Sequence, residues 1–340
     1  MIATARHWCF DMSLKILFYG FRHSHINSLY KKVCSSALAE VAGCIESNAE
    51  AREKAERLLG ATFSDVSYED WLHSDIDAVA VGTAYGERGE AIIKALEAGK
   101  HVIADKPICT ELCELERIRE LARNKGLKIA CMLDLRYTPQ SVKAREIIQS
   151  GRIGEVRNVS FNGQHCIDYA NRPSWYFEAG KHGGTLNDIA IHGVDLVRMI
   201  TGLDFSRTHA ARCWNAYADR NKDFEDCATF MAELSNGAGV LADVSYSAPT
   251  QAFRLPTYWE FRFWCDRGML QLSYNDKQIT LVEEGVELPM CIDCPDAPEG
   301  YLSEFISEIE RGDSAVTENL LASTEQTLRI QQVSRGREGL

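Results

Sequence analysis

An aspartate and a histidine stand four residues apart in the segment GGTLNDIAIHGVD, which runs from Gly183 to Asp195. If this segment is helical, Asp188 and His192 lie one turn apart on the same face. A carboxylate and an imidazole fixed together can exchange protons with a bound molecule, because histidine titrates near neutral pH. A buried polar pair that ties a core helix to its neighbours has the same spacing, so the pair alone leaves both interpretations open.

The residues around this pair predict the helix. Gly183-Gly184 provides a permissive start, and Gly202 stands just past the last turn, where helices often stop. Apolar residues between them recur at helical spacing and form a stripe for burial: Leu186, Ile189, Val194, Leu196, Val197 and Ile200.

Strands and helices alternate with short connections through the first part of the chain. Apolar runs at 15–19, 39–45, 78–82, 101–104 and 128–133 predict strands, and the segments between them predict helices from about 26, over 49–59, over 68–73, up to 98 and over 110–124. This alternation predicts a parallel sheet with helices on both faces, in which ligands bind beyond the carboxyl ends of the strands.

Two features indicate what such a ligand could be. The turn after the first strand, Gly20 to His25, keeps only the first glycine of the G-x-G-x-x-G pattern that lets backbone approach a pyrophosphate, so a plain strand-to-helix turn is equally compatible. Glu46 ends the second strand, where a carboxylate accepts hydrogen bonds from both ribose hydroxyls and repels a 2'-phosphate. This favours NAD over NADP, although Glu46 could also be an ordinary solvated carboxylate.

Lys106 directly follows a buried strand, which places it at the ligand-binding edge of the predicted sheet. Pro107 restricts Lys106 to extended backbone and ends the strand with a turn. A single lysine at a strand end is usually exposed to solvent, so its neighbours must decide its role.

Three motifs in order resemble the glucose-fructose oxidoreductase and inositol dehydrogenase family, also called Gfo/Idh/MocA. The stretch ALEAGKHVIADKP, Ala95 to Pro107, resembles the family's A-L-x-A-G-K-H-V-x-x-E-K-P pattern, and Gly183 to Asp195 resembles its G-G-x-x-x-D-x-x-x-H segment followed by an aspartate. The segment from Arg136 to Val156 is similar to the family's junction between domains.

The resemblance implies an α/β protein with an N-terminal Rossmann domain over 12–135 and a substrate-binding and oligomerisation domain over 136–340, an α+β domain with an open, largely antiparallel sheet. It implies an NAD(P)-dependent dehydrogenase acting on CH–OH groups, with a cis Lys106-Pro107 bond. The catalytic positions it implies are Lys106, Asp188 and His192. The residues expected around the cofactor are Gly20, Arg22, His23, His25, Glu46, Thr83, Asp105, Lys106 and Pro107.

This chain departs from the family pattern around the cofactor. Arg22 and His25 replace the second and third glycines of the turn, and Asp105 stands where glutamate is usual. Thr83 begins a T-A-Y segment in place of T-P-N, and Arg88 falls where histidine is frequent. Arg22 could compensate by pairing with the pyrophosphate, because a guanidinium binds phosphate bidentately; alternatively, the two histidines of the turn simply cap it.

The second half of the chain is richer in strands. Strands are expected at 156–166, 206–216, 227–234, 240–247, 258–265 and 269–274, with hairpins across Asn236-Gly237 and across 266–268. Helices are expected over 139–150, 301–311 and 318–334. The aromatic residues Trp259, Phe261, Phe263 and Trp264 suggest that one sheet face forms a homodimer or homotetramer interface, or else that they fill the domain's own core.

The loop before Gly183 interleaves polar and aromatic residues, which suits recognition of a sugar or polyol. Trp175 and Tyr176 are the candidate substrate contacts, together with Lys106, Asp188 and His192.

Removal of hydride from a carbinol carbon needs a base for the hydroxyl proton and a group that holds the oxygen. His192 is the candidate base, Lys106 the candidate oxygen ligand, and Asp188 the residue that orients a neighbouring hydroxyl. Two alternatives remain: a catalytically silent dinucleotide-sensing regulator of the same fold, and a zinc site at His182, Asp188 and His192, which lacks a thiolate or a second histidine at fixed spacing. No metal is expected.

Composition limits the partners. The chain has 340 residues and a net charge of -12, which argues against nucleic-acid binding. No apolar run could span a bilayer, and the twelve cysteines form no disulfide framework, so a cytoplasmic protein is expected. Cys291 and Cys294 are expected in a loop with free thiols, and residues 1–11 are interpreted as a possible extension before a start at Met12.

Overall fold

The computed structural model describes residues 13–251, 254–294, 296 and 300–336, and the proposed extension over 1–11 lies outside them. The chain divides into two compact units, each with its own sheet. The first unit comprises residues up to 109, 113–132 and 301–320, and the second comprises 110–112, 133–300 and 321 onward. The segment 301–320 therefore belongs with the first unit, although the sequence placed it with the second domain. The predicted boundary between 135 and 136 stays a prediction.

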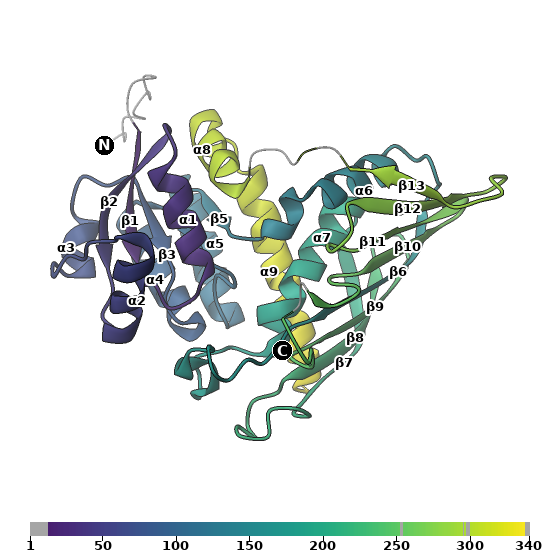
Figure 1. Ribbon diagram of the computed structural model, residues 1–340. Coiled ribbons are helices and arrows are strands. Elements are labelled where there is room, and N and C mark those ends of the chain that lie inside the picture. The colour runs from purple at the N-terminus through teal and green to yellow at the C-terminus, as the bar shows by residue number, and fades with distance from the viewer. Residues whose placement is uncertain (1–12, 252–253, 295, 297–299, 337–340) are drawn as a thin grey trace. The chain divides into compact units, whose positions relative to one another are not determined.

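The first unit is built on a five-stranded parallel sheet of order β2-β1-β3-β4-β5, which confirms the predicted Rossmann domain (Figure 1). The strands are β1 (Leu14–Tyr19), β2 (Ala39–Ile45), β3 (Ala78–Val81), β4 (His101–Ala104) and β5 (Ile129–Cys131). Its helices are α1 (His25–Cys34), α2 (Ala49–Leu59), α3 (Tyr68–Leu72), α4 (Tyr85–Glu97), α5 (Leu112–Lys125) and α8 (Tyr301–Arg311).

Local sequence explains where these elements start and stop. Every residue of β3 is buried, as expected of a central strand without polar side chains. Helix α2 begins because the Asn48 side chain accepts a hydrogen bond from the Ala51 N–H, and it ends at Gly60, whose φ of 64° closes the last turn.

The second unit is built on an open eight-stranded sheet of order β13-β12-β11-β10-β6-β9-β8-β7. All neighbouring strands run antiparallel except β6 and β9, so the predicted largely antiparallel sheet is confirmed. The strands are β6 (Val156–Gln164), β7 (Phe205–Trp214), β8 (Cys227–Leu234), β9 (Gly239–Ser245), β10 (Phe261–Cys265), β11 (Gly268–Leu272), β12 (Gln278–Glu283) and β13 (Met290–Asp293).

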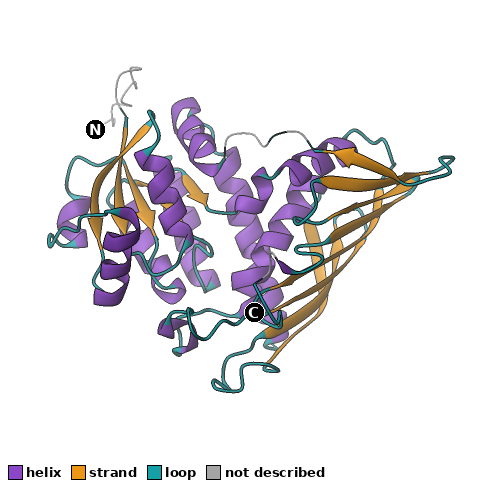
Figure 2. Ribbon diagram, viewed as in Figure 1, coloured by secondary structure: helices purple, strands orange, loops and turns teal. Residues whose placement is uncertain are grey.

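Helices cover only one face of this sheet among the residues described. They are α6 (Pro139–Gln149), α7 (Ile191–Thr201) and the second part of α9 (Ala315–Ser334), and Figure 2 shows them on one side of the strands. Helix α7 lies close against β6 because Gly193 faces Phe161: a Cβ at Gly193 would stand 2.1 Å from the Phe161 ring. This close approach fixes the height of α7, and of His192 beside it, above the sheet.

The structure corrects three expectations for this unit. Strands β12 and β13 were not predicted, and Cys291 lies in β13 rather than in a loop. Trp259, Phe261 and Phe263 are buried in the unit's own core, so the interface interpretation is wrong for these three; Trp264 is 51% exposed, and its part in an interface stays a prediction. Both predicted hairpins are present, since β8 pairs with β9 across Gly237 and β10 with β11.

None of the cysteines in the described ranges forms a disulfide. The same ranges contain no helix that is both long and apolar enough to cross a membrane.

Candidate active site

The turn after β1 comes into direct backbone contact with the turn after β3. Gly20 has a φ of 87°, and a Cβ there would lie 2.6 Å from the Thr83 nitrogen. Only glycine combines this conformation with such a close approach. The one glycine that the turn retains is therefore required to bring the two strand ends together at the carboxyl edge of the sheet.

Glu46 supports this turn from the end of β2. Its Oε2 accepts a hydrogen bond from the Phe21 N–H at 2.5 Å, and its Oε1 accepts one from the Asn48 N–H at 2.7 Å. The side chain is only 7% exposed, so the alternative of an ordinary solvated carboxylate is wrong. Glu46 links β2 to the turn at the position where the sequence expected a ribose ligand.

Asp105, at the end of β4, gathers the two histidines of the turn. His23 Nδ1 lies 2.7 Å from Asp105 Oδ2, and His25 Nδ1 lies 3.2 Å from Oδ1. The guanidinium of Arg88, fully buried on α4, lies 3.4 Å from Oδ2. His25, which replaces the third glycine, and Asp105, which replaces the glutamate, thus form one connected cluster with His23 and Arg88.

Burial and charge set the protonation of this cluster. Burial lowers the pKa of His23 to about 4, against the opposing pull of Asp105, so the ring is neutral at pH 7 and donates its Nδ1 proton to the carboxylate. Burial alone would raise the pKa of Asp105, but His23, Arg88 and His25 hold that pKa well below its ordinary value.

His23, His25 and Asp105 each bring a potential metal ligand within 4.8 Å of the others. Their surroundings favour an anion instead, because His25 begins α1 and the positive end of a helix dipole lies there beside the buried cation of Arg88. Ser24 precedes α1 without a side-chain capping bond. The cluster therefore resembles a support for a phosphate more than a metal centre.

A dinucleotide fits the groups at this edge. The Thr83 hydroxyl is buried and has no hydrogen-bond partner within the described residues, so a ligand could supply one. The first turn of α1 offers backbone N–H groups to an anion. Arg22 follows the glycine, with its own N–H bonded to the Gly82 carbonyl at 2.9 Å, and its side chain is half-buried.

Lys106 lies buried at the same carboxyl edge of the sheet, just after β4. Its bond to Pro107 is cis, as the resemblance implied. Arg88 holds this peptide by donating hydrogen bonds to the Lys106 carbonyl and to the Pro107 carbonyl at 3.1 Å. The Lys106 ammonium lies 5.7 Å from the centre of the Tyr85 ring. An ammonium on so fixed a backbone can donate hydrogen bonds to a negatively charged oxygen without reorganisation.

In the second unit, Asp188 and His192 lie on one continuous helical segment, but its first turn differs from the prediction. Leu186–Ala190 forms a π-helical turn that carries Asp188, and α7 begins only at Ile191. Such π turns often occur at functional sites. Both side chains are buried, Asp188 to 2% exposure, and the His192 ring meets Trp259 edge-on with 5.6 Å between centroids.

Asp188 has two partners that the sequence did not identify together. The Tyr246 hydroxyl, just after β9, donates a hydrogen bond to Asp188 Oδ2. His182 Nε2 lies 3.3 Å from the same oxygen and 3.0 Å from the Tyr246 hydroxyl. Of the three residues considered for zinc, His182 and Asp188 are in contact. Among the described residues, the group that could hold a metal ion is His23, His25 and Asp105.

Trp259 borders His192 in a conformation that bulky residues rarely adopt. Its φ is 50°, and its ring lies over Gly163, where a Cβ would come within 2.6 Å. Left-handed backbone at a bulky residue costs free energy and is concentrated at functional sites. The sequence identified Trp259 only as one of several aromatic residues. Its positive φ, which the structure shows, distinguishes it from the others.

Trp175 and Tyr176 are buried, and their rings do not form a solvent-exposed surface for substrate. They form part of a 3-10 turn over Ser174–Phe177, and each is 1% exposed. Their rings lie 4.4 Å apart, and Tyr176 lies 5.0 Å from the His182 ring. Their contact with substrate stays a prediction, while the packing of Tyr176 against His182 is a role that the sequence did not suggest.

Comparison with known proteins identifies the family. Residues 17–132 match the oxidoreductase family with an NAD-binding Rossmann fold, and residues 141–271 match the GFO/IDH/MocA C-terminal domain. The chain belongs to the Gfo/Idh/MocA family. In this family member the motif residues Lys106, Asp188 and His192 are all present and all buried.

Named relatives of this Gfo/Idh/MocA protein include dehydrogenases. A levoglucosan dehydrogenase from Pseudarthrobacter phenanthrenivorans is 31% identical over 48% of this chain and 43% of that protein. An NAD(+)-dependent scyllo-inositol 2-dehydrogenase from Bacillus subtilis is 27% identical over 66% of this chain and 64% of that protein. The chain therefore matches about half the length of these curated relatives.

The fold also matches solved structures along nearly its whole length. A levoglucosan dehydrogenase in complex with NADH and levoglucosan superimposes with a TM-score of 0.80 at 20% identity, covering 96% of this chain and 98% of that one. At that identity the likeness supports the fold alone.

Proposed function

We propose that this protein is an NAD-dependent oxidoreductase that transfers hydride between nicotinamide and a carbinol carbon of a sugar, sugar acid or cyclitol. The observation that carries the proposal is the survival of Lys106, Asp188 and His192, each buried and each on a structurally fixed segment. Buried ionisable groups are costly, so a set that matches a family's catalytic motif favours chemistry over a packing role.

Each residue has a part that its chemistry suits. His192 takes the hydroxyl proton as the alcohol is oxidised and returns it in the reverse reaction. Lys106 donates a hydrogen bond to the same oxygen and stabilises its developing negative charge. Asp188 accepts a hydrogen bond from a hydroxyl of the substrate and fixes its orientation. The nicotinamide, when bound, supplies the hydride acceptor or donor.

NAD is the proposed cofactor because Glu46 keeps a carboxylate at the end of β2. Two backbone N–H groups hold this carboxylate in place. The 2'-phosphate of NADP would approach it, and the two negative charges would repel each other. The variant Glu46→Gln keeps the size of the side chain and removes its charge. We expect its preference for NADH over NADPH to fall by about tenfold or more, while Glu40→Gln, exposed on the same strand, leaves the preference unchanged.

The first experiment is a titration of the purified protein with NADH and with NADPH, followed by quenching of tryptophan emission. Tighter binding of NADH supports the proposal and leads to an oxidation assay with NAD and a panel of polyols and sugars. The variant His192→Ala is expected to lower turnover about a hundredfold or more while NADH still binds. If neither cofactor binds, the dehydrogenase proposal is wrong.

A dinucleotide sensor without turnover is the second candidate. The observation that favours it is the cluster at Asp105, in which the His25 side chain stands in the turn where the family has glycine. A protein that binds NADH but oxidises no member of the panel, and whose His192→Ala variant behaves as wild type, supports the sensor.

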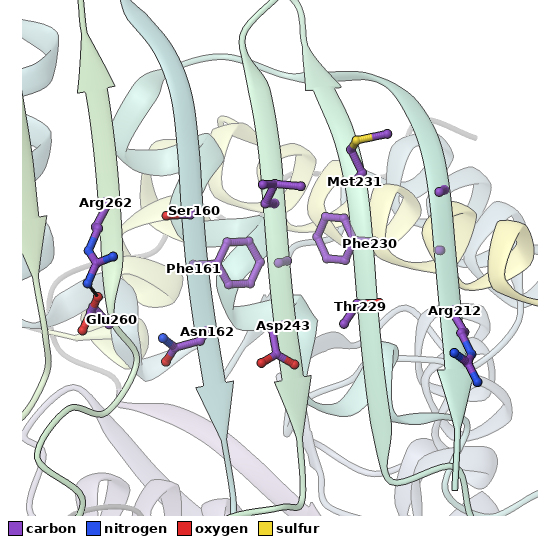
Figure 3. Close-up of a pocket in the computed structure, with 14 residues that line it drawn as sticks. Ser160, Phe161, Asn162, Arg212, Thr229, Phe230, Met231, Asp243, Glu260 and Arg262 are labelled. Atoms are coloured by element: carbon purple, nitrogen blue, oxygen red, sulfur yellow. Dashed lines mark ion pairs between the residues drawn. The ribbon is translucent and has the colours of Figure 1, made fainter. Parts of the chain in front are cut away.

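We also propose that the open face of the second unit's sheet binds a second copy of the chain. Met231 on β8 and Leu241 on β9 are cross-strand partners there, 45% and 52% exposed. They lie beside an open hollow of about 560 Å³, and Figure 3 shows its polar residues, with Arg212 toward one edge and Glu260 and Arg262 toward the other. A two-fold axis would place Met231 and Leu241 of one copy against the same apolar centre of the other.

The oligomeric state tests this interface. We expect Leu241→Glu to shift the protein toward monomer in light scattering after size-exclusion chromatography, because a charge replaces an apolar centre. Leu288→Glu is the matched control, since Leu288 is 73% exposed and does not line the hollow. Unchanged mass for both variants contradicts the interface.

A further inference from the structure

Two hydrogen-bonding groups from different segments converge on one oxygen of Asp188. Tyr246 donates its hydroxyl proton to Oδ2, and His182 Nε2 lies 3.3 Å from the same atom. His182 Nε2 also lies 3.0 Å from the Tyr246 oxygen. Asp188, His182 and Tyr246 all belong to the second unit and all are buried.

A count of protons decides how His182 takes part. A phenol has one proton, and Tyr246 gives it to Asp188. The Tyr246 oxygen can then only accept a hydrogen bond from His182, so His182 Nε2 must carry a hydrogen. The same N–H also lies near Asp188 Oδ2, at the longer distance of 3.3 Å. Asp188 therefore receives two donors on one oxygen, and both stabilise its ionised form.

The partners of Asp188 are themselves held in place. The guanidinium of Arg172 lies over the Tyr246 ring at 5.1 Å and donates a hydrogen bond to the Cys166 carbonyl at 2.6 Å. The His182 ring lies 4.9 Å from the ring of Phe224. Donors with so little freedom lose little entropy when they bind the carboxylate, which makes each hydrogen bond more effective.

We propose that Tyr246 and His182 are positioning residues that keep Asp188 as an ionised acceptor for a substrate hydroxyl, so that Asp188 binds substrate and leaves proton transfer to His192. The proposal rests on the proposed oxidoreductase function. It divides the two members of the Asp188/His192 pair by role: Asp188 is held by its donors as a hydrogen-bond acceptor for substrate, and His192 is the proposed base.

The groups that face Asp188 within the second unit include His182, Tyr246 and, one turn along its own helix, His192; Arg172 acts on it through the Tyr246 ring. Removing a donor from Asp188 must raise the pKa of its carboxyl, because burial then opposes the charge with less compensation. The effect of losing Tyr246 should therefore depend on pH: large where Asp188 becomes protonated and small at alkaline pH.

The test replaces Tyr246 by Phe, which removes one hydroxyl and keeps the ring. We expect kcat/KM of Tyr246→Phe to fall at least threefold further at pH 6 than at pH 9 relative to wild type, with a rise in KM larger than the loss in kcat. Tyr274→Phe is the matched control, since Tyr274 is another hydrogen-bonded phenol of the second unit, bonded to Ser141 and the Leu135 carbonyl. A loss that is the same at every pH contradicts the proposal and indicates a packing role.

His182 offers a rescue experiment. His182→Leu removes the donor and should reproduce the pH-dependent loss, whereas His182→Gln restores an N–H in a similar place and should recover most of kcat/KM. Equal activity of the two variants overturns the part assigned to His182. Thermal melting of each variant separates these effects from unfolding.

A measurement without turnover keeps this inference distinct from the proposed function. The carboxyl carbon of Asp188 can be followed by 13C NMR of aspartate-labelled protein, with Asp188→Asn to assign its signal. We expect the titration of this carboxyl to move up by about one pH unit or more in Tyr246→Phe. If wild type oxidises no alcohol, the proposed function fails, while an unmoved titration overturns the role of Tyr246 whatever the activity.

Discussion

His101 makes the stability of the first unit depend on pH. It begins β4, and its Nδ1 accepts a hydrogen bond from the Lys128 N–H at 2.9 Å, just before β5. Burial, and then the charge of Lys128, lower the pKa of His101 to about 4 from 6.5. A ring nitrogen that accepts a hydrogen bond cannot also carry a proton, so the contact and the shifted pKa agree.

The sign and size of the effect follow from this shift. Between pH 6.5 and about pH 4 the unfolded chain binds a proton at His101 that the folded chain does not, so the free energy of unfolding falls as the pH falls through this range. The full contribution is present above pH 6.5. Each pH unit costs about 1.4 kcal/mol, so a change from pH 7 to pH 5 removes about 2 kcal/mol through His101 alone.

The variant His101→Asn isolates this contribution, because the Asn side-chain oxygen can still accept from the Lys128 N–H and does not titrate. Urea unfolding of wild type and variant at pH 7 and pH 5 should show a wild-type loss about 2 kcal/mol larger than that of the variant. His23 titrates in both proteins and cancels in the comparison. His209→Asn, on β7 of the second unit, controls for the removal of a histidine.

Equal losses in wild type and His101→Asn would refute the reasoning. They would mean that His101 gains a proton in the folded protein as easily as in the unfolded chain, and that its hydrogen bond to Lys128 does not oppose protonation.

Two further substitutions test contacts that hold the second unit. Gly193→Ala places a methyl group 2.1 Å from the Phe161 ring and should lower the free energy of unfolding by about 1–3 kcal/mol in urea titrations. Gly239→Ala is the control: its methyl group meets nothing closer than 3.7 Å, so the free energy of unfolding should change by less than about 0.5 kcal/mol. Asp226→Asn removes a buried carboxylate that accepts hydrogen bonds from the backbone N–H groups of 216–218; faster hydrogen exchange at these amides and a loss of about 1–3 kcal/mol are expected, and unchanged exchange contradicts this role.

Local patterns in the sequence were sufficient to predict the elements that carry the site. The five strands of the first unit are short and mostly apolar, with Lys15 in β1 and Glu40 in β2 as interruptions. Asn236-Gly237 between two apolar runs predicted a hairpin that the structure contains. Lys106, Asp188 and His192 were identified by motifs with fixed spacing. Such features depend on neighbours in sequence, which is why they can be read without a structure.

The partners of these residues could not be predicted in this way. Tyr246 lies 58 residues from Asp188, and Arg88 lies 18 residues from the Lys106 carbonyl that it binds. Nothing in a tyrosine after a strand or an arginine in a helix states which distant group it meets. Arg88 was noted only as a departure from the family. Its helical spacing from Tyr85 and Ile92, on the apolar side of the predicted helix, was the sequence signal that could have indicated a buried, paired charge.

The backbone details also depend on tertiary packing. The π turn at Leu186–Ala190 accommodates one residue more per turn than an α-helix, and the apolar stripe of the segment is compatible with either. Strand β13 has four residues, and its alternation is too short to distinguish it from a loop by pattern.

The first unit is assembled from segments that the ribosome makes at very different times. Thr317 covers the free edge of strand β5: its hydroxyl donates a hydrogen bond to the Ile129 carbonyl at 3.3 Å and accepts one from the Ile129 N–H at 2.9 Å. The Lys128 ammonium donates a hydrogen bond to the Ser314 hydroxyl at 2.8 Å. Until residue 320 leaves the exit tunnel, β5 has an exposed edge, and exposed edges recruit other strands. The first unit must therefore wait for residues 301–320, which are made long after its fifth strand. A gene shortened after that strand should yield an aggregating fragment.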